Sequence, residues 1–268
     1  MFYEGREKRL EIVTQGVNLL NFPLHFWHAM VKNTGAYILC ELKETKIKAF
    51  ILSESSLFIW ENKLLLITCG NTHLLQAALY FKNESPVNSI KSLLFQRHQA
   101  NQPDAQKSTF SEDIAILQTM IKGKCQHWQD DYQGDIFQSD TYQSENSTTD
   151  IIMLNSLQSC FSKRLHNTTV SSATIEQQLQ LNTYFKTFSI HQHSFHPRGY
   201  SVNGVQDEYY FTLHLSPEKV ASYLSFETNL ESDISKPFIE HLITLFNPKK
   251  SYLMSFTSHT DISIKVLK

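Results

Sequence analysis

The sequence lacks the features that would place it in a membrane, on nucleic acid or in an oxidising compartment. No apolar run approaches the roughly 18 residues that a membrane-spanning helix requires, and the N-terminus opens with charged residues instead of an apolar secretory segment. The formal net charge of −2 provides no basic surface for nucleic acid. The four cysteines show no CxxC pairing, so neither a zinc site nor a disulfide framework is predicted. These absences indicate a soluble, cytoplasmic protein with reduced thiols.

The chain is long enough for a large core, because 41% of its 268 residues are hydrophobic, and this length is near the upper limit for one domain. We therefore expect a single domain over 1–268. Clustered strand patterns with helices between them favour antiparallel sheets with helices packed outside. Strands are expected at 36–42, 47–53 continuing into 57–60, 63–68, 184–195, 209–215, 222–227, 252–256 and 262–266.

Helices are predicted where apolar residues recur at helical spacing. One begins near Thr72; another follows Thr109, which forms a capping-box pattern with Glu112; a third is capped by Ser235 and ends at Asn247. The segment 124–150 is dense in polar residues and is expected to be a long loop around short edge strands. Residues 199–204 are expected to form a turn because glycine bounds them.

The segment from Leu52 to Phe58 places two serines and a carboxylate inside an apolar run. Burying a hydroxyl without a partner costs roughly 1–3 kcal/mol, so such serines need a reason to be there. One reason is chemical, because a serine hydroxyl can attack the carbonyl of the preceding residue and convert the amide to an ester. Elimination would then break the chain at Glu54–Ser55 and leave a pyruvoyl group. Taken alone, however, the Ser-Glu-Ser-Ser pattern usually marks a strand end or a turn.

Six short motifs occur in one order along the chain. They are YEGREKRLE at 3–11, LSESSLF at 52–58, TCG at 68–70, GYSVNG at 199–204, LHLSPE at 213–218 and YLSFETN at 223–229. This series resembles the eukaryotic-type S-adenosylmethionine decarboxylases, the pyruvoyl enzymes of polyamine synthesis, over about residues 2–256. The resemblance implies an α+β fold, a four-layer α/β/β/α sandwich of two antiparallel sheets flanked by helices. It also implies a proenzyme that cleaves itself into 1–54 and 55–268.

The resemblance assigns catalytic roles to matching residues. Ser55 becomes the pyruvoyl group, which forms a Schiff base with the substrate, and Cys69 returns a proton after carbon dioxide leaves. Ser201 supports ester formation, and His214 removes the α-proton during elimination. Without the resemblance, these would be an inert strand serine, a small buried hydrophobe, a turn-forming serine and a structural histidine.

Further residues match the substrate site of the family. The adenine would stack between Tyr3 and Phe195, and Glu218 would hold the ribose hydroxyls. Leu52 and Glu54 also match substrate-binding positions, and Glu4 and Glu7 match acids that act in processing and turnover. Without the resemblance, Tyr3 and Phe195 would be core aromatics and Glu218 a solvated loop acid. Glu4 and Glu7 would then lie on the solvated face of a helix.

Three departures from the family pattern bear on regulation, assembly and substrate choice. The acidic site that binds the activator putrescine in animal enzymes matches Glu11, Asn146, Asp150 and Glu227, and the asparagine removes a charge, which makes putrescine activation doubtful. The chain ends short of the family's usual C-terminal strands, and an open sheet edge could need a partner, so a homodimer is possible. His196 and Arg198 stand where uncharged residues are expected and could alter substrate choice.

Rival interpretations remain open. His191 and His193 would share one face of a strand and His196 follows, but no nearby carboxylate or cysteine completes a ligand set, so no metal site is expected. An inactive or regulatory paralogue would bind an active decarboxylase, but it would be expected to lose Ser55, His214 or Cys69, and all three are present. A pyruvoyl decarboxylase of a different amino acid is the third possibility, because fold does not determine substrate.

Overall fold

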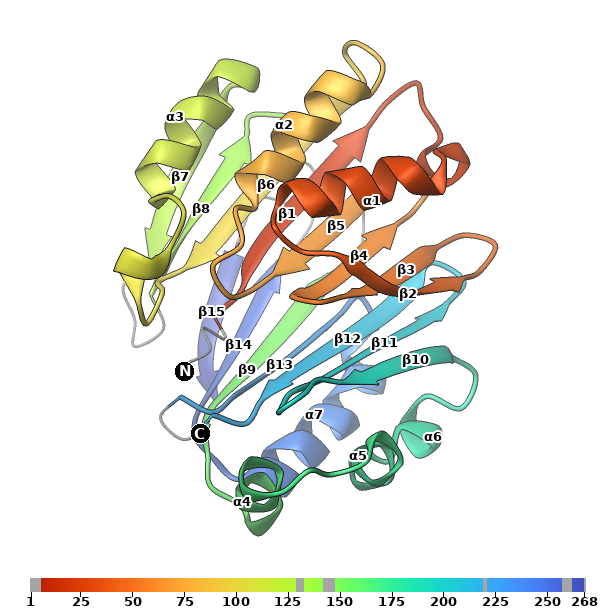
Figure 1. Cartoon of the computed structure of the whole chain (residues 1–268), viewed down its shortest axis with the longest axis vertical. Coiled ribbons are helices and arrows are strands. Elements are labelled where there is room, and N and C mark those ends of the chain that lie inside the picture. The colour runs from red at the N-terminus through yellow and green to blue at the C-terminus, as the bar shows by residue number, and fades with distance from the viewer. Residues whose placement is uncertain (1–5, 129–132, 142–147, 219–220, 257–261, 268) are drawn as a thin grey trace. The chain divides into compact units, whose positions relative to one another are not determined.

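The computed structural model describes residues 6–128, 133–141, 148–218, 221–256 and 262–267, and the side chains of 262–266 are not among them. The chain divides into two compact units, which we call the first unit (6–143) and the second unit (144–268). Each unit contains one antiparallel sheet with helices on one of its faces (Figure 1).

The first unit contains an eight-stranded sheet in the order β2-β3-β4-β5-β1-β6-β8-β7. Its strands are β1 (Lys8–Thr14), β2 (Ile38–Lys43), β3 (Lys48–Leu52), β4 (Ser55–Ile59), β5 (Lys63–Thr68), β6 (Ile90–His98), β7 (Gly123–Trp128) and β8 (Gly134–Ser139). Its helices are α1 (Leu24–Asn33), α2 (Leu75–Glu84) and α3 (Phe110–Met120), with short 3-10 turns at Leu19–Asn21 and Pro103–Ala105.

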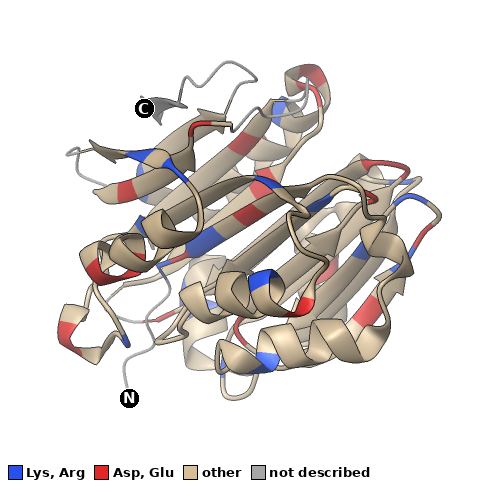
Figure 2. Ribbon diagram, turned by 90° about the horizontal axis from the view of Figure 1, so that it is seen from above, with Lys and Arg blue, Asp and Glu red and all other residues tan. Residues whose placement is uncertain are grey.

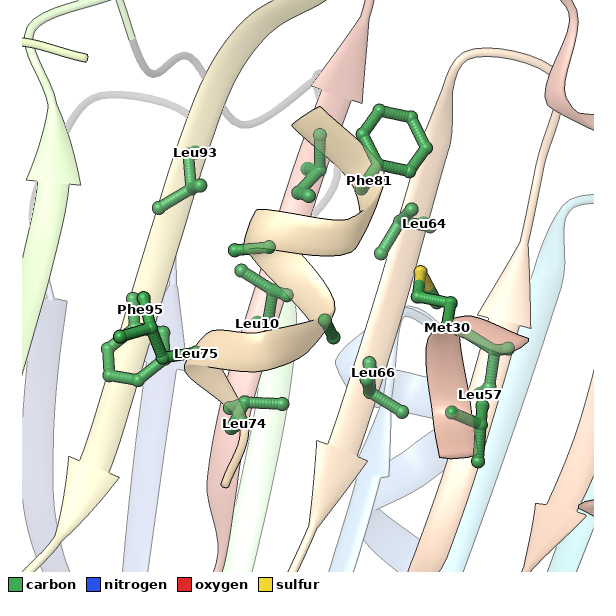
Figure 3. Packing of buried hydrophobic residues seen from close by; sticks show 14 of the residues in the cluster. Leu10, Met30, Leu57, Leu64, Leu66, Leu74, Leu75, Phe81, Leu93 and Phe95 are labelled. Atoms are coloured by element: carbon green, nitrogen blue, oxygen red, sulfur yellow. The ribbon is translucent and has the colours of Figure 1, made fainter. Parts of the chain in front are cut away.

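The core of the first unit lies between its helices and one face of the sheet. In Figure 3, α2 runs along the strands, and Leu75 and Phe81 of α2, with Leu74 just before it, belong to the same buried cluster as Met30 of α1 and Leu57. Period-2 alternation along the strands supplies the opposing residues, which include Leu10, Leu64, Leu66, Leu93 and Phe95. Each fully buried side chain of this size stabilises the fold by about 1.5–3 kcal/mol relative to an exposed one.

The second unit contains a seven-stranded sheet in the order β10-β11-β12-β13-β9-β14-β15. Its strands are β9 (Thr149–Leu157), β10 (Ser189–Ser194), β11 (Tyr200–Gln206), β12 (Tyr209–Ser216), β13 (Tyr223–Thr228), β14 (Pro248–Phe256) and β15 (Ile262–Leu267). Its helices are α4 (Cys160–Asn167), α5 (Ser172–Leu179), α6 (Leu181–Tyr184) and α7 (Ser232–Phe246). Phe185 stacks on Phe211 with ring centroids 4.0 Å apart and packs against Phe238 of α7, which joins the helices to the sheet.

Charged residues lie mainly on loops and helices, and long stretches of the strands carry none (Figure 2). Strand β1 is an exception, because Lys8, Arg9 and Glu11 are all at most 5% exposed. Over the described residues, no helix has both the length and the apolar character needed to cross a membrane.

The expected fold class, two antiparallel sheets flanked by helices, is confirmed. The capping box of Thr109 and Glu112 is also present, with the Thr109 hydroxyl accepting from the Glu112 N–H and the Glu112 carboxylate accepting from the Thr109 N–H. Helix α7 ends at Phe246, next to the expected stop.

Three local expectations were wrong. The segment 47–60 is a hairpin that turns at Ser53–Glu54, not one continuing strand. Residues 199–204 belong mostly to strand β11, and Gly204 is there because a Cβ would lie within 2.1–2.7 Å of the Phe211 ring. Ser235 does not cap α7, which begins three residues earlier with Glu231 at its N-cap position.

The expectation of short edge strands within 124–150 was right, because β7 lies at the edge of the first sheet with β8 beside it, but the beginning of β9 was missed. Strand β9 pairs with both β13 and β14 inside the second sheet. Strand β1 was not predicted either, since its charged residues hide the alternation of Leu10 and Ile12. Buried charges thus concealed one of the most central strands of the first sheet.

Candidate active site

The predicted cleavage point lies at the end of a tight hairpin turn in the first unit. Leu52 and Ser55 face each other across β3 and β4, so Ser53 and Glu54 alone connect the strands. Ser55 is 3% exposed and has a φ of +132°. Holding a non-glycine residue at positive φ costs about 1–3 kcal/mol of conformational free energy. The backbone is therefore strained at the predicted scissile bond.

Two donors from Cys69 converge on the carbonyl oxygen of Glu54, the carbonyl of that same bond. The Cys69 N–H donates at 3.0 Å and its thiol donates at 3.3 Å. Cys69 follows the last residue of β5, and the β4–β5 pairing brings this point of the chain beside the turn. Donors placed in this way stabilise negative charge that develops on a carbonyl oxygen.

Thr68 lies opposite Ser55 in the pairing of β5 with β4 and was not predicted as a site residue. Its hydroxyl oxygen is buried and has no hydrogen-bond partner among the described residues. An unsatisfied buried hydroxyl costs roughly 1–3 kcal/mol, and polar groups of this kind concentrate at sites of function. Only the strand register identifies it, because a threonine at the end of an apolar strand is ordinary in sequence.

Ser201 and His214 meet in the second unit. They are directly opposite residues on β11 and β12, and they are 3% and 8% exposed. Opposite residues of an antiparallel pair have Cβ atoms about 4.5–5.5 Å apart. The two residues are therefore direct neighbours, and Ser201 occupies a strand and not the expected turn.

Hydrogen bonds fix the His214 imidazole. Its Nε2 lies 3.0 Å from the hydroxyl of Thr212, which donates to the Asn203 side-chain oxygen at 2.8 Å. A hydroxyl that donates its proton to Asn203 must accept from His214, so this network assigns the imidazole proton to Nε2. Nδ1 is then the basic nitrogen, and Ser225 Oγ is 3.5 Å from it.

The expected substrate-binding residues are distributed over both units. Phe195 follows β10, is half-buried and packs edge-on against His193 with centroids 4.7 Å apart. Glu218 is half-buried and follows β12 after Pro217. Leu52 and Glu54 flank the hairpin turn, and the Leu52 side chain lies in the helix-side core. Glu7 is 6% exposed, whereas Tyr3 and Glu4 lie outside the described residues.

Each described acid of the expected putrescine site has a polar partner. Glu11 of β1 accepts from Arg9 at 2.9 Å, and both side chains are about 5% exposed. In the second unit, Glu227 accepts from Tyr210 and Asp150 accepts from Ser255, each at 2.5 Å. Asn146 lies outside the described residues. Arg9 was not predicted as a residue of this site. Its buried guanidinium already supplies a positive charge to Glu11.

Comparisons with known proteins agree over nearly the full length. The family model described as adenosylmethionine decarboxylase matches residues 1–267. The S-adenosylmethionine decarboxylase proenzyme of Drosophila melanogaster is 27% identical, over 100% of this chain and 86% of the relative. The proenzyme of Xenopus laevis is 26% identical, over 97% and 84%.

A solved structure supports the fold. The Trypanosoma brucei AdoMetDC-delta26 monomer superposes with a TM-score of 0.58 at 20% identity, covering 74% of this chain and 78% of that one. The match of the family model over residues 1–267 places the chain in the adenosylmethionine decarboxylase family.

Proposed function

We propose that the chain is a self-processing, pyruvoyl-dependent decarboxylase of S-adenosylmethionine, acting as one functional domain. Its product would be the decarboxylated nucleoside that donates aminopropyl groups for spermidine and spermine synthesis. The observation that carries the proposal is the Glu54 carbonyl, which stands at a strained turn and accepts two hydrogen bonds from Cys69. We place the activity in the cytoplasm.

Self-cleavage begins when the Ser55 hydroxyl attacks the Glu54 carbonyl carbon. The negative charge that develops on the carbonyl oxygen is stabilised by the Cys69 N–H and thiol. Collapse breaks the C–N bond, forms an ester and frees the Ser55 amine. The strained φ torsion of Ser55 is defined through the Glu54–Ser55 peptide bond. Because this step breaks that bond, it releases the backbone strain, which favours the ester. Ser201 supports this step.

The second step breaks the chain. His214 takes the α-proton of Ser55 through Nδ1, and the Glu54 carboxylate leaves as the new C-terminus of 1–54. Water then replaces the nitrogen of the dehydrated residue and releases ammonia, which leaves pyruvoyl at the start of 55–268. Glu4 and Glu7 are assigned to processing and turnover.

In turnover, the pyruvoyl carbonyl supplies an electron sink for the charge left by departing carbon dioxide. The residues of this chain bind the substrate and move the proton. Tyr3 and Phe195 stack on the adenine, Glu218 accepts from the ribose hydroxyls, and Leu52 and Glu54 are assigned to the same substrate site. Cys69 delivers the proton to the substrate α-carbon.

The mass of the purified protein under denaturing conditions tests this proposal. We expect two fragments that meet at Glu54/Ser55, with the larger one blocked to Edman degradation. A single uncut chain would overturn the proposal and favour the inactive or regulatory paralogue. Cleavage without decarboxylation of S-adenosylmethionine would instead favour a different amino acid substrate.

Putrescine is expected to have little effect on the wild-type enzyme, because Arg9 already neutralises Glu11. Arg9→Leu leaves a buried carboxylate without this partner, and breaking a buried ion pair costs about 3–5 kcal/mol. We expect the variant to lose both activity and resistance to urea. Initial rates with putrescine, or with sodium chloride of equal ionic strength, provide the measurement. Several-fold activation of the wild type by putrescine alone would contradict this expectation.

A further inference from the structure

The residues that follow Cys69 form an irregular connection between β5 and α2. Gly70 has a φ of +65°, and the Thr72 hydroxyl donates back to the Cys69 carbonyl at 2.8 Å. We call residues 69–72 the cysteine turn. Its conformation decides whether the Cys69 N–H and thiol point at the Glu54 carbonyl, since nothing in the regular pairing of β5 extends beyond Thr68.

Lys8 of β1 holds this turn. Its ammonium nitrogen donates to the Gly70 carbonyl at 3.2 Å and to the Thr72 carbonyl at 2.5 Å, and the residue is 4% exposed. An ammonium group carries only donors, and a carbonyl only accepts, so the direction of both bonds is fixed by chemistry. Burying an ammonium group costs free energy unless hydrogen bonds compensate for its lost hydration. The two charge-assisted bonds to the carbonyls provide this compensation.

The neighbouring contacts show that Lys8 fixes the turn at two points. Lys8 pairs with Thr68 across β1 and β5, so its side chain starts beside the residue that precedes Cys69. Gln106 also donates to the Gly70 carbonyl, at 3.3 Å. The hydrogen bond from the Thr72 hydroxyl to the Cys69 carbonyl then links the position of Thr72 to that of Cys69. Loss of the ammonium would remove its bond to the Thr72 carbonyl and leave the Gly70 carbonyl with the longer bond from Gln106, so the turn would be held less firmly.

We propose that Lys8 is a positioning residue that holds the cysteine turn and thereby aims both Cys69 donors at the Glu54 carbonyl for self-cleavage. This inference rests on the proposed self-processing but concerns a different group. The Lys8 ammonium bonds to the Gly70 and Thr72 carbonyls, so it acts on self-cleavage through these two residues and Cys69.

The rate of self-cleavage in newly synthesised protein is the first measurement. We expect Lys8→Met to slow the appearance of the 55–268 fragment by about tenfold, the change that corresponds to about 1.4 kcal/mol of lost stabilisation. Thr72→Val removes the hydroxyl that bonds to Cys69 without burying a charge, and it should slow cleavage as well. The matched control is Lys48→Met, since Lys48 also donates to a backbone carbonyl, that of Leu20, at 2.6 Å in the same unit.

Alkylation of Cys69 separates positioning from general loss of stability. In a Ser55→Ala background, which cannot cleave, Lys8→Met should raise the rate at which iodoacetamide labels Cys69 several-fold. The Cys40 peptide of the same unit serves as the internal reference, and Lys48→Met should leave the Cys69 to Cys40 ratio unchanged. This measurement remains valid if the wild-type chain proves not to cleave.

The outcomes are distinguishable. An uncut wild-type chain overturns the proposed function, and the labelling ratio then still decides whether Lys8 holds the turn. Suppose that the wild-type chain cleaves, and that Lys8→Met cleaves at the same rate and labels Cys69 at the same rate as its parent. This result overturns the role of Lys8 alone. Slow cleavage in Lys48→Met to the same extent as in Lys8→Met would also overturn it, because the effect would then be one of stability.

Discussion

Ser55→Ala and Ser55→Gly are both expected to give a single uncut chain with no decarboxylase activity, and the glycine variant is expected to be the more stable. Neither variant has the hydroxyl needed to form the ester. Their order of stability follows from the φ of +132° at Ser55. A Cβ at positive φ costs about 1–2 kcal/mol, whereas glycine adopts such angles freely. Urea unfolding of the two uncut proteins measures the difference directly.

Ser56 provides the matched control for this comparison. It is the next residue of β4, is fully buried and does not have a positive φ. There the usual order should hold, with Ser56→Ala more stable than Ser56→Gly by about 0.5–1 kcal/mol. If alanine is also the more stable residue at position 55, the scissile junction is not strained and the proposed driving force for ester formation is wrong.

His214→Ala is expected to stop processing after the ester has formed. Loss of a general base typically lowers the rate of proton transfer by about 10²–10⁴-fold. The variant should therefore run as one chain that hydroxylamine, which cleaves esters and not amides, splits at Glu54/Ser55. Ser201→Ala should stop processing earlier and leave a chain that resists hydroxylamine. Electrophoresis with and without hydroxylamine distinguishes these results.

A milder variant tests how His214 is held. Thr212→Val keeps the imidazole but removes the hydroxyl that accepts from Nε2, so it should slow cleavage by about tenfold, the usual scale for one hydrogen bond of this kind.

Normal processing in His214→Ala would show that another group takes the α-proton, and the assignment of the base would fail.

The sequence alone was sufficient for the parts of this protein that depend on short stretches. The order of six motifs led to the family, an apolar run located β5, period-2 alternation located β12, and Thr109 with Glu112 marked the start of α3. Local patterns failed where packing across the fold decided the structure. Gly204 resembles a turn residue, but its role is to make room for the Phe211 ring, so the segment with Ser201 is a strand.

Only the tertiary structure revealed how the candidate site is supported. Lys8 reaches the carbonyl of Thr72, 64 residues away, and Thr68 becomes notable only through its register with Ser55. Arg9 would be read as a surface charge, although it pairs with Glu11 inside β1. Such contacts arise when strands distant in sequence are brought together by burial of the core between them. The sequence determines which groups exist for the chemistry, and folding alone determines which carbonyl each of them faces.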